Sequence, residues 1–108
     1  MTESLTADEF KKLVCSMWTE KEFMAKVVTL AKACGWKVYH PFDSRRSAAG
    51  FPDLTMVRGS RLLFAELKKD GKTPTAKQKE WLEALGNAYA EAYCWEPYQW
   101  AEIEKLLE

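Results

Sequence analysis

Two apolar segments joined by a short turn constrain the fold of this chain more than any other feature. Residues 53–57 and 61–67 are rich in side chains typical of strands, and the Arg-Gly-Ser triplet at 58–60 is a turn signal. The sequence therefore predicts a β-hairpin. Asp53 opens its first strand and Glu66 lies near the end of its second, so neighbouring strand segments present two carboxylates.

Lys68 follows Glu66 by two residues, and side chains two apart on a strand share one face. Two carboxylates and a lysine are the groups that phosphodiester hydrolysis needs. Carboxylates can hold Mg²⁺, which prefers oxygen ligands, and the metal lowers the pKa of a bound water. The lysine can position that water or stabilise the transition state. Because these residue types are common, the pattern alone is a weak signal.

The length of 108 residues predicts one domain over residues 1–108, with residues 1–18 as an extra N-terminal helix. Hydrophobic residues make up 47% of the chain, which is enough for a small core. A domain this small buries a modest share of its surface, so oligomerisation is plausible. No apolar run is long enough to span a bilayer and no secretory signal opens the chain, so we expect a cytoplasmic protein.

The cysteines and the single histidine exclude several kinds of site. Cys15, Cys34 and Cys94 are odd in number, far apart and in apolar settings, which favours buried free thiols over disulfides or metal ligands. His40 is the only histidine. That argues against a His-Cys zinc site, an HNH-type nuclease and a Ser-His-Asp hydrolase.

A formal net charge of zero conceals an uneven distribution. Residues 37–79 carry ten basic and four acidic side chains, a net +6, whereas residues 80–108 carry one basic and seven acidic ones, a net −6. The basic segment contains the two carboxylates and the lysine. Basic side chains near a phosphate backbone gain affinity through counterion release. A solvated surface with chance asymmetry explains the count equally well.

Capping boxes mark the starts of the first two helices. Thr6 with Glu9, and Thr19 with Glu22, match the pattern in which the cap and the third helical residue bond to each other's backbone. The second helix has apolar residues at helical spacing and stops at Gly35. The remaining segments alternate between strand and helix. They are a strand at 36–40, the hairpin, a helix at 75–85, a strand at 92–95 and a helix at 98–107.

The predicted order is α-α-β-β-β-α-β-α, which favours a mixed sheet flanked by helices in an α/β or α+β architecture. Five short motifs then occur in order along the chain. They are Thr-Glu-Lys-Glu-Phe at 19–23, Gly-Trp at 35–36, Gly-Phe-Pro-Asp-Leu at 50–54, Ala-Glu-Leu-Lys at 65–68 and Thr-Ala-Lys-Gln-Lys-Glu-Trp-Leu at 75–82.

Together these motifs resemble the VRR-NUC family, the virus-type replication-repair nuclease branch of the PD-(D/E)XK superfamily. The resemblance runs from about residue 19 to the end of the chain and is to a stand-alone, phage-type member. It implies an α/β fold of the restriction-endonuclease type with a mixed central sheet. It also implies a Mg²⁺- or Mn²⁺-dependent DNA endonuclease for structured DNA, similar to Holliday-junction resolvases and homodimeric. A phage-encoded member would work in the host-cell cytoplasm, with no membrane or small-molecule substrate.

Three other functions are compatible with the same residues. The first is the same chemistry on flaps, nicks or duplex ends. The second is a DNA-binding module that has lost turnover, although both carboxylates and the lysine are present. The third is an acidic protein-interaction domain led by the C-terminal third of the chain.

Asp53 and Glu66 are the expected metal ligands, and the resemblance implies that the Leu67 carbonyl completes the metal shell. Each acid also has an ordinary explanation. Asp53 could simply end a loop, and Glu66 could point to water from an edge strand. An acid inside such an apolar strand is costly unless it is paired. Lys68 is the expected catalytic lysine, since Lys69 points to the opposite face.

A helix-borne acid and a glutamine are expected to support this site. Glu20 and Glu22 are both candidates, and Glu22 already serves the capping box. Glu20 is favoured because it lies three and seven residues before Phe23 and Val27, which places it on the apolar stripe that faces inward. An acid is also favoured near any helix start by the dipole. Gln78 matches the glutamine of the family, and it equally completes a capping box with Thr75. These two roles of Gln78 are compatible.

The loops on either side of the site supply candidate DNA contacts. They are Arg45, Arg46, Ser47, Lys69, Lys72 and Lys77. Trp81, Trp95 and Trp100 lie in apolar patterns, which favours the core or a dimer interface over base stacking.

Overall fold

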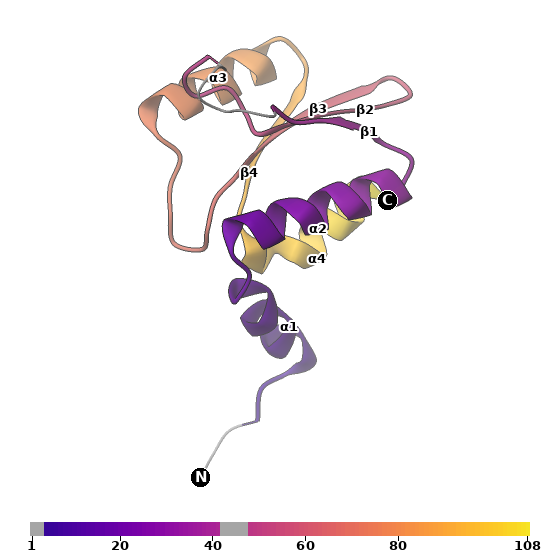
Figure 1. Cartoon of the computed structure of the whole chain (residues 1–108), viewed down its shortest axis with the longest axis vertical. Coiled ribbons are helices and arrows are strands. Elements are labelled where there is room, and N and C mark those ends of the chain that lie inside the picture. The colour runs from indigo at the N-terminus through magenta and orange to yellow at the C-terminus, as the bar shows by residue number, and fades with distance from the viewer. Residues whose placement is uncertain (1–3, 42–47) are drawn as a thin grey trace.

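The computed structural model describes residues 4–41 and 48–108, and its helices and strands follow the predicted order (Figure 1). A short 3-10 turn before the last helix is an addition to that order. The elements are α1 (Ala7–Ser16), α2 (Glu20–Ala33), β1 (Lys37–Tyr39), β2 (Leu54–Arg58), β3 (Arg61–Leu67), α3 (Ala76–Asn87), β4 (Glu91–Trp95), η2 (Pro97–Gln99) and α4 (Trp100–Leu107).

The predicted hairpin is formed by β2 and β3, with a tighter turn than the sequence indicated. Leu54 lies opposite Ala65 and Arg58 lies opposite Arg61, so only two residues connect the strands. Gly59, the first of them, has φ of +59°, the backbone conformation that two-residue hairpin turns require. Arg58 therefore belongs to the strand and not to the turn.

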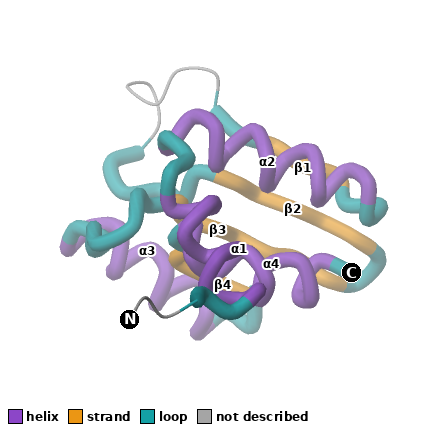
Figure 2. The backbone as a smooth tube through the Cα atoms, turned by 90° about the horizontal axis from the view of Figure 1, so that it is seen from below, coloured by secondary structure: helices purple, strands orange, loops and turns teal. Residues whose placement is uncertain are grey.

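The four strands form one mixed sheet in the order β1-β2-β3-β4. Strands β1 to β3 are antiparallel, and β4 is parallel to β3 because α3 crosses between them. Helices α2 and α4 cover one face of this sheet and α3 lies on the other, while α1 extends away from the body (Figures 1 and 2). The predicted mixed α/β sheet flanked by helices is confirmed.

The core lies between the sheet and the pair α2 and α4. Alternation along the strands points Leu54, Met56, Leu63 and Ala65 to this side, where all four are fully buried. The helices contribute Phe23, Val27, Ala31, Ile103 and Leu107. The opposite face of β3 carries Phe64 and Glu66 beneath α3, so the site faces away from the main core.

Two arginines of the hairpin fasten the end of α4 to the sheet. Arg58 donates hydrogen bonds of 2.8 to 2.9 Å to the carbonyl oxygens of Cys34, Leu107 and Glu108. Arg61 pairs with a carboxylate on β4 at 2.7 Å, and both guanidinium groups lie over the Trp36 ring. Two of the ten basic residues in the basic segment therefore hold the fold together.

The cysteines are free in the structure, as expected, although only Cys15 is buried and Cys34 and Cys94 are half-buried. Trp95 is buried in the core, while Trp81 and Trp100 are half-buried. Within residues 4–41 and 48–108, no helix has the length and apolar character needed to cross a bilayer.

Candidate functional site

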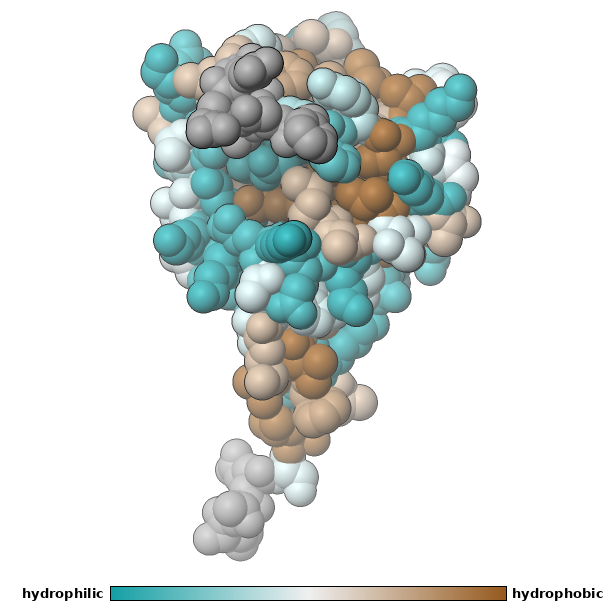
Figure 3. Space-filling model, viewed as in Figure 1, coloured by the Kyte–Doolittle hydropathy of each residue, from teal (hydrophilic) through white to brown (hydrophobic). Residues whose placement is uncertain are grey.

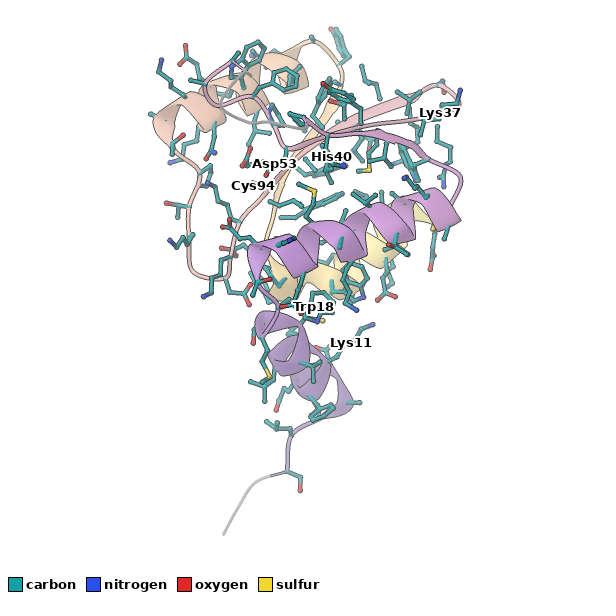
Figure 4. The ribbon with its side chains drawn as sticks, viewed as in Figure 1. Lys11, Trp18, Lys37, His40, Asp53 and Cys94 are labelled. Atoms are coloured by element: carbon teal, nitrogen blue, oxygen red, sulfur yellow. The ribbon has the colours of Figure 1, made fainter. Side chains whose placement is uncertain are left out.

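Asp53 and Glu66 meet where the hairpin strands enter and leave the sheet. Asp53 directly precedes β2, and the register that pairs Leu54 with Ala65 places Asp53 opposite Glu66. Directly opposite residues project from the same face of a sheet. The Asp53 Oδ2 atom accepts a hydrogen bond from the backbone N–H of Leu67 at 2.9 Å, which fixes its carboxylate against β3. Figure 4 shows Asp53 in this part of the sheet.

Glu66 is the one charged side chain that is buried in the described part of the chain, at 3% exposure. Burial, followed by the hydrogen bond and the charge of Asp53, raises the pKa of Glu66 to about 8, and Lys68 acts in the opposite direction. Gln78 Nε2 donates a hydrogen bond to Glu66 Oε1 at 3.2 Å. The fold thus holds two carboxyl groups close together, although they repel each other when both are ionised.

A polar hollow of about 310 Å³ contains all five side chains that the sequence predicts as catalytic. They come from the start of α2, from the residue before β2, from the end of β3 and the residue that follows it, and from the first turn of α3. Residues far apart in the sequence are therefore collected at one end of the sheet. The lining residues are Glu20, Pro41, Ala48, Ala49, Gly50, Phe51, Pro52, Asp53, Glu66, Leu67, Lys68 and Gln78.

The geometry separates the two acids of the α2 start. Glu22 Oε1 accepts a hydrogen bond from the Thr19 backbone N–H at 3.0 Å and completes the capping box. Glu20 Oε1 accepts instead from the backbone N–H of Lys69 at 3.2 Å, which brings it to the hollow. Glu20 is nevertheless exposed, and not part of a buried stripe, because the buried part of α2 begins one turn later at Phe23.

Gln78 completes the predicted capping box and also contacts Glu66. Its Oε1 atom accepts a hydrogen bond from the Thr75 backbone N–H at 2.8 Å, so it completes the capping box of α3. Its amide nitrogen is then directed at Glu66. One side chain therefore ties the start of α3 to the buried carboxyl.

The loop before Asp53 is pressed against α3, a feature that sequence reasoning missed. Gly50 has φ of +84°, and a Cβ atom there would lie 2.6 Å from the Lys77 carbonyl carbon. The Phe51 ring packs edge-on against Phe64 at 5.9 Å and Trp81 at 5.0 Å. Gly50 and Phe51, which precede Pro52-Asp53, were the only sequence signal for this contact. They were used only as part of the motif at 50–54.

Three of the predicted DNA contacts are exposed on the surface, and the other three lie outside the described residues. Lys69 and Lys72 are exposed in the loop after β3, and Lys77 is exposed in the first turn of α3. Arg45, Arg46 and Ser47 lie outside the residues that the structure describes.

The donor set fits a hard divalent cation. Within the described residues, no three His, Cys, Asp or Glu side chains form a ready metal cluster. Asp53 and Glu66 are a two-carboxylate set, which together with a backbone carbonyl and water suits Mg²⁺ or Mn²⁺. The raised pKa of Glu66 supports the fit, because a cation between the carboxylates would remove the repulsion that opposes ionisation.

A mixed sheet between helices, with Pro-Asp at the start of one strand and Glu-Leu-Lys at the end of the next, defines a PD-(D/E)XK-type fold. A solved structure described as a "VRR_NUC domain protein" matches this chain with a TM-score of 0.65 and 26% identity. The match covers 83% of this chain and 85% of the other. The fold of this chain is therefore similar to that of a VRR-NUC domain, as the sequence resemblance implied. No family model matches the sequence, and no curated protein matches it significantly.

Proposed function

We propose that this domain is a metal-dependent DNA endonuclease that hydrolyses phosphodiester bonds in structured DNA, with Holliday-junction resolvase-like activity. The pairing of the buried Glu66 with the half-buried Asp53 carries the proposal. A fold that buries a carboxyl group beside a second one incurs a desolvation cost, and a divalent cation at this position would compensate for it. The likeness to a solved structure described as a "VRR_NUC domain protein" supports the same class of chemistry.

Asp53, Glu66 and the carbonyl oxygen of Leu67 would hold Mg²⁺ or Mn²⁺. The cation supplies Lewis-acid stabilisation of the phosphate and raises the acidity of water. The hydrogen bond from the Leu67 N–H orients Asp53. Gln78 does the same for Glu66, so neither carboxylate has to be reorganised when the substrate arrives.

Lys68 shares the face of β3 with Glu66 and lines the same hollow. Its ammonium group would donate hydrogen bonds to phosphate oxygens or hold the attacking water in line. Glu20 supports the site from the opposite wall, where the Lys69 backbone holds its carboxylate.

DNA would be held by the two loops that border the hollow, with Lys69, Lys72 and Lys77 as phosphate contacts beside Arg45, Arg46 and Ser47. We further propose a homodimer, because a resolvase cuts two strands related by a two-fold axis and a C₂ dimer matches that symmetry. The proposed location is the cytoplasm, that of the host cell if a phage encodes the protein.

Cleavage of labelled DNA tests the proposal directly. The substrates are a four-way junction, a linear duplex and a flap, each with Mg²⁺, with Mn²⁺ and with EDTA. Metal-dependent paired nicks in the junction are the expected result. If only the flap or the duplex is cut, the assignment of the site stands but the proposed substrate is wrong. Tight DNA binding with no cutting under any condition would contradict the proposed enzymatic activity and would favour a DNA-binding module.

Two substitutions test whether Asp53 and Glu66 are the metal ligands. Asp53→Asn and Glu66→Gln are expected to abolish cutting and spare DNA binding, because both keep the shape of the side chain and remove a cation ligand. The matched control is Glu83→Gln on the exposed side of α3, which should cut normally. Cutting that survives in either site variant would show that the ligands are wrongly assigned.

A further inference from the structure

Helix α1 faces its own chain with its charged side. Asp8, Lys11, Lys12 and Cys15 line a small hollow against η2 and the start of α4. Lys11 Nζ lies 2.6 Å from Glu104 Oε1, an ion pair between α1 and α4. Residues spaced by three and four fall on one side of a helix, so these four positions define the inward side of α1.

The outward side of α1 is apolar. Phe10, Leu13, Val14 and Met17 follow the i, i+3, i+4, i+7 spacing of a single stripe, and their exposure ranges from 41% to 76%. Figure 3 shows hydrophobic surface on the narrow part of the molecule that α1 forms. An isolated soluble domain normally places such a stripe inward, so this orientation indicates that another surface covers it.

The chain also carries a groove that can receive a helix. Ala25, Thr29 and Ala33 present small side chains along one side of α2, and the charged side chains of Glu22 and Lys26, together with Leu30 and Trp100, complete the lining. The groove has a volume of about 580 Å³. Small residues in a row allow a second helix to approach closely, and the neighbouring aliphatic and aromatic side chains provide apolar contact.

The stripe of α1 cannot reach this groove in its own chain. Only residues 17–19 connect α1 to α2. Trp18, in the middle of that connection, packs against Phe23 at 6.4 Å and Trp100 at 5.2 Å, and Lys26 Nζ lies over its ring. With the ion pair at its inward side, α1 is fixed with the stripe directed away from α2.

We propose that the apolar stripe of α1 docks into the α2 groove of a second copy of this chain, reciprocally around a two-fold axis. A ten-residue helix is about 15 Å long and by itself buries less than the roughly 800 Å² per partner of a standard interface. A reciprocal contact uses one stripe and one groove from each chain, which doubles the area and leaves no free end. This inference rests on the proposed homodimer and names the surface that forms it.

Sedimentation of the full chain at micromolar concentration, with matched variants, tests the inference. Leu13→Gln removes apolar area from the stripe, and Thr29→Arg fills the groove. Each should raise the dimer dissociation constant on the order of a hundredfold, because the change occurs twice in a two-fold dimer. Both positions are exposed in the single chain, so the variants should remain folded by circular dichroism.

The controls introduce the same two side chains, glutamine and arginine, elsewhere on the surface. Leu62→Gln on the sheet and Ala84→Arg on α3 also alter exposed positions, and both should leave the dimer intact. A dimer that persists in both the stripe and the groove variants would overturn the proposed surface while the homodimer stands. A monomeric parent chain would overturn the surface and the homodimer together. The cleavage assay decides the nuclease activity independently.

Cross-linking then identifies the pairing. A mixture of a Leu13→Cys chain and a Thr29→Cys chain should form a disulfide-linked heterodimer under mild oxidation. A disulfide that forms only between two Leu13→Cys chains would show stripe-on-stripe pairing and overturn the groove as the receptor.

Discussion

Glu66 is a carboxyl group whose protonation is coupled to the stability of the fold. Its pKa lies at about 8 in the folded chain, against an ordinary value of 4.5, chiefly because it is buried and then because Asp53 is beside it. Between these two pH values the folded chain binds the proton more tightly than the unfolded chain does. The stability of the metal-free protein should therefore fall as pH rises from 4.5 to about 8.

Glu66→Gln should flatten that dependence, because a neutral amide has no charge to bury. It also leaves an oxygen that can accept the hydrogen bond from Gln78. Urea unfolding with EDTA at both ends of this pH range measures the effect, and the variant should exceed the parent in stability only at the alkaline end. Equal pH dependence in the two proteins would contradict the raised pKa.

Gly50 provides a second test at the scale of single residues. Gly50→Ala places a methyl group 2.6 Å from the Lys77 carbonyl carbon, so the loop that carries Asp53 must move away from α3. Gly71→Ala is the matched control, since Gly71 has the same φ of +84° with nothing within 4 Å. Urea unfolding should show that Gly50→Ala costs about 1–3 kcal/mol more than the control. Equal losses of stability in the two variants would mean that the positive φ alone explains why glycine occupies position 50.

At the start of α3, the capping box that stabilises the helix also positions a residue of the candidate site. Thr75 caps α3, and the same box holds Gln78 toward Glu66. Thr75→Ala should destabilise the protein by about 1 kcal/mol, because the hydroxyl that accepts a hydrogen bond from the Gln78 backbone N–H is lost. It should lower cleavage as well, because the first turn of α3, which carries Gln78, is then less firmly held.

The matched control for this element is Thr6→Ala, which removes the cap of the same type of box on α1, far from the hollow. It should lower helix stability and leave cleavage by the assembled protein unchanged at saturating protein. Chemical denaturation and initial cleavage rates measure the two effects. Equal cleavage by both variants would contradict a positioning role for the α3 start.

Elements with strong local signals were predictable from the sequence. All three Thr-x-x-Glu/Gln boxes form as predicted, since their hydrogen bonds involve residues only three apart. The hairpin was also predictable, because its strands are contiguous in sequence. The extra residue assigned to its turn was wrong, because the register of Arg58 with Arg61 depends on side-chain contacts to α4 and β4 that are remote in sequence.

The residues of the candidate site could be chosen from the sequence, and the structure brings all five predicted catalytic side chains to one hollow, but their geometry could not be predicted. Alternation placed Glu66 and Lys68 on one face, and the resemblance added Glu20 and Gln78. The contact of Gly50 with α3 joins segments that are distant in sequence, so no local pattern contains it. The exposure of Glu20 was missed for a similar reason, since helical spacing does not show where the sheet ends.

At the scale of the whole molecule, fewer basic side chains are available to DNA than the ten counted in residues 37–79. Arg58 and Arg61 are occupied by carbonyl oxygens and a carboxylate, whereas Lys77 lies exposed beside the hollow. Lys77→Gln should weaken DNA binding and reduce the slope of log K against log salt by about 1. Lys105→Gln, an exposed change on α4, is the control and should leave the slope unchanged. Fluorescence anisotropy over a salt series measures both slopes, and equal slopes would remove Lys77 from the interface.

The junction between the first strand and the last helix has a consequence for biosynthesis. Trp36 Nε1 donates a hydrogen bond to the carbonyl oxygen of Leu107, 71 residues later, and Leu107 itself is fully buried. A ribosome delivers the chain from its N-terminus, so the core stays open until Leu107 has emerged from the exit tunnel. During that interval the face of α2 that packs against α4 is exposed to solvent. We therefore expect this apolar face to be open to chaperones until the last turn of α4 packs against it.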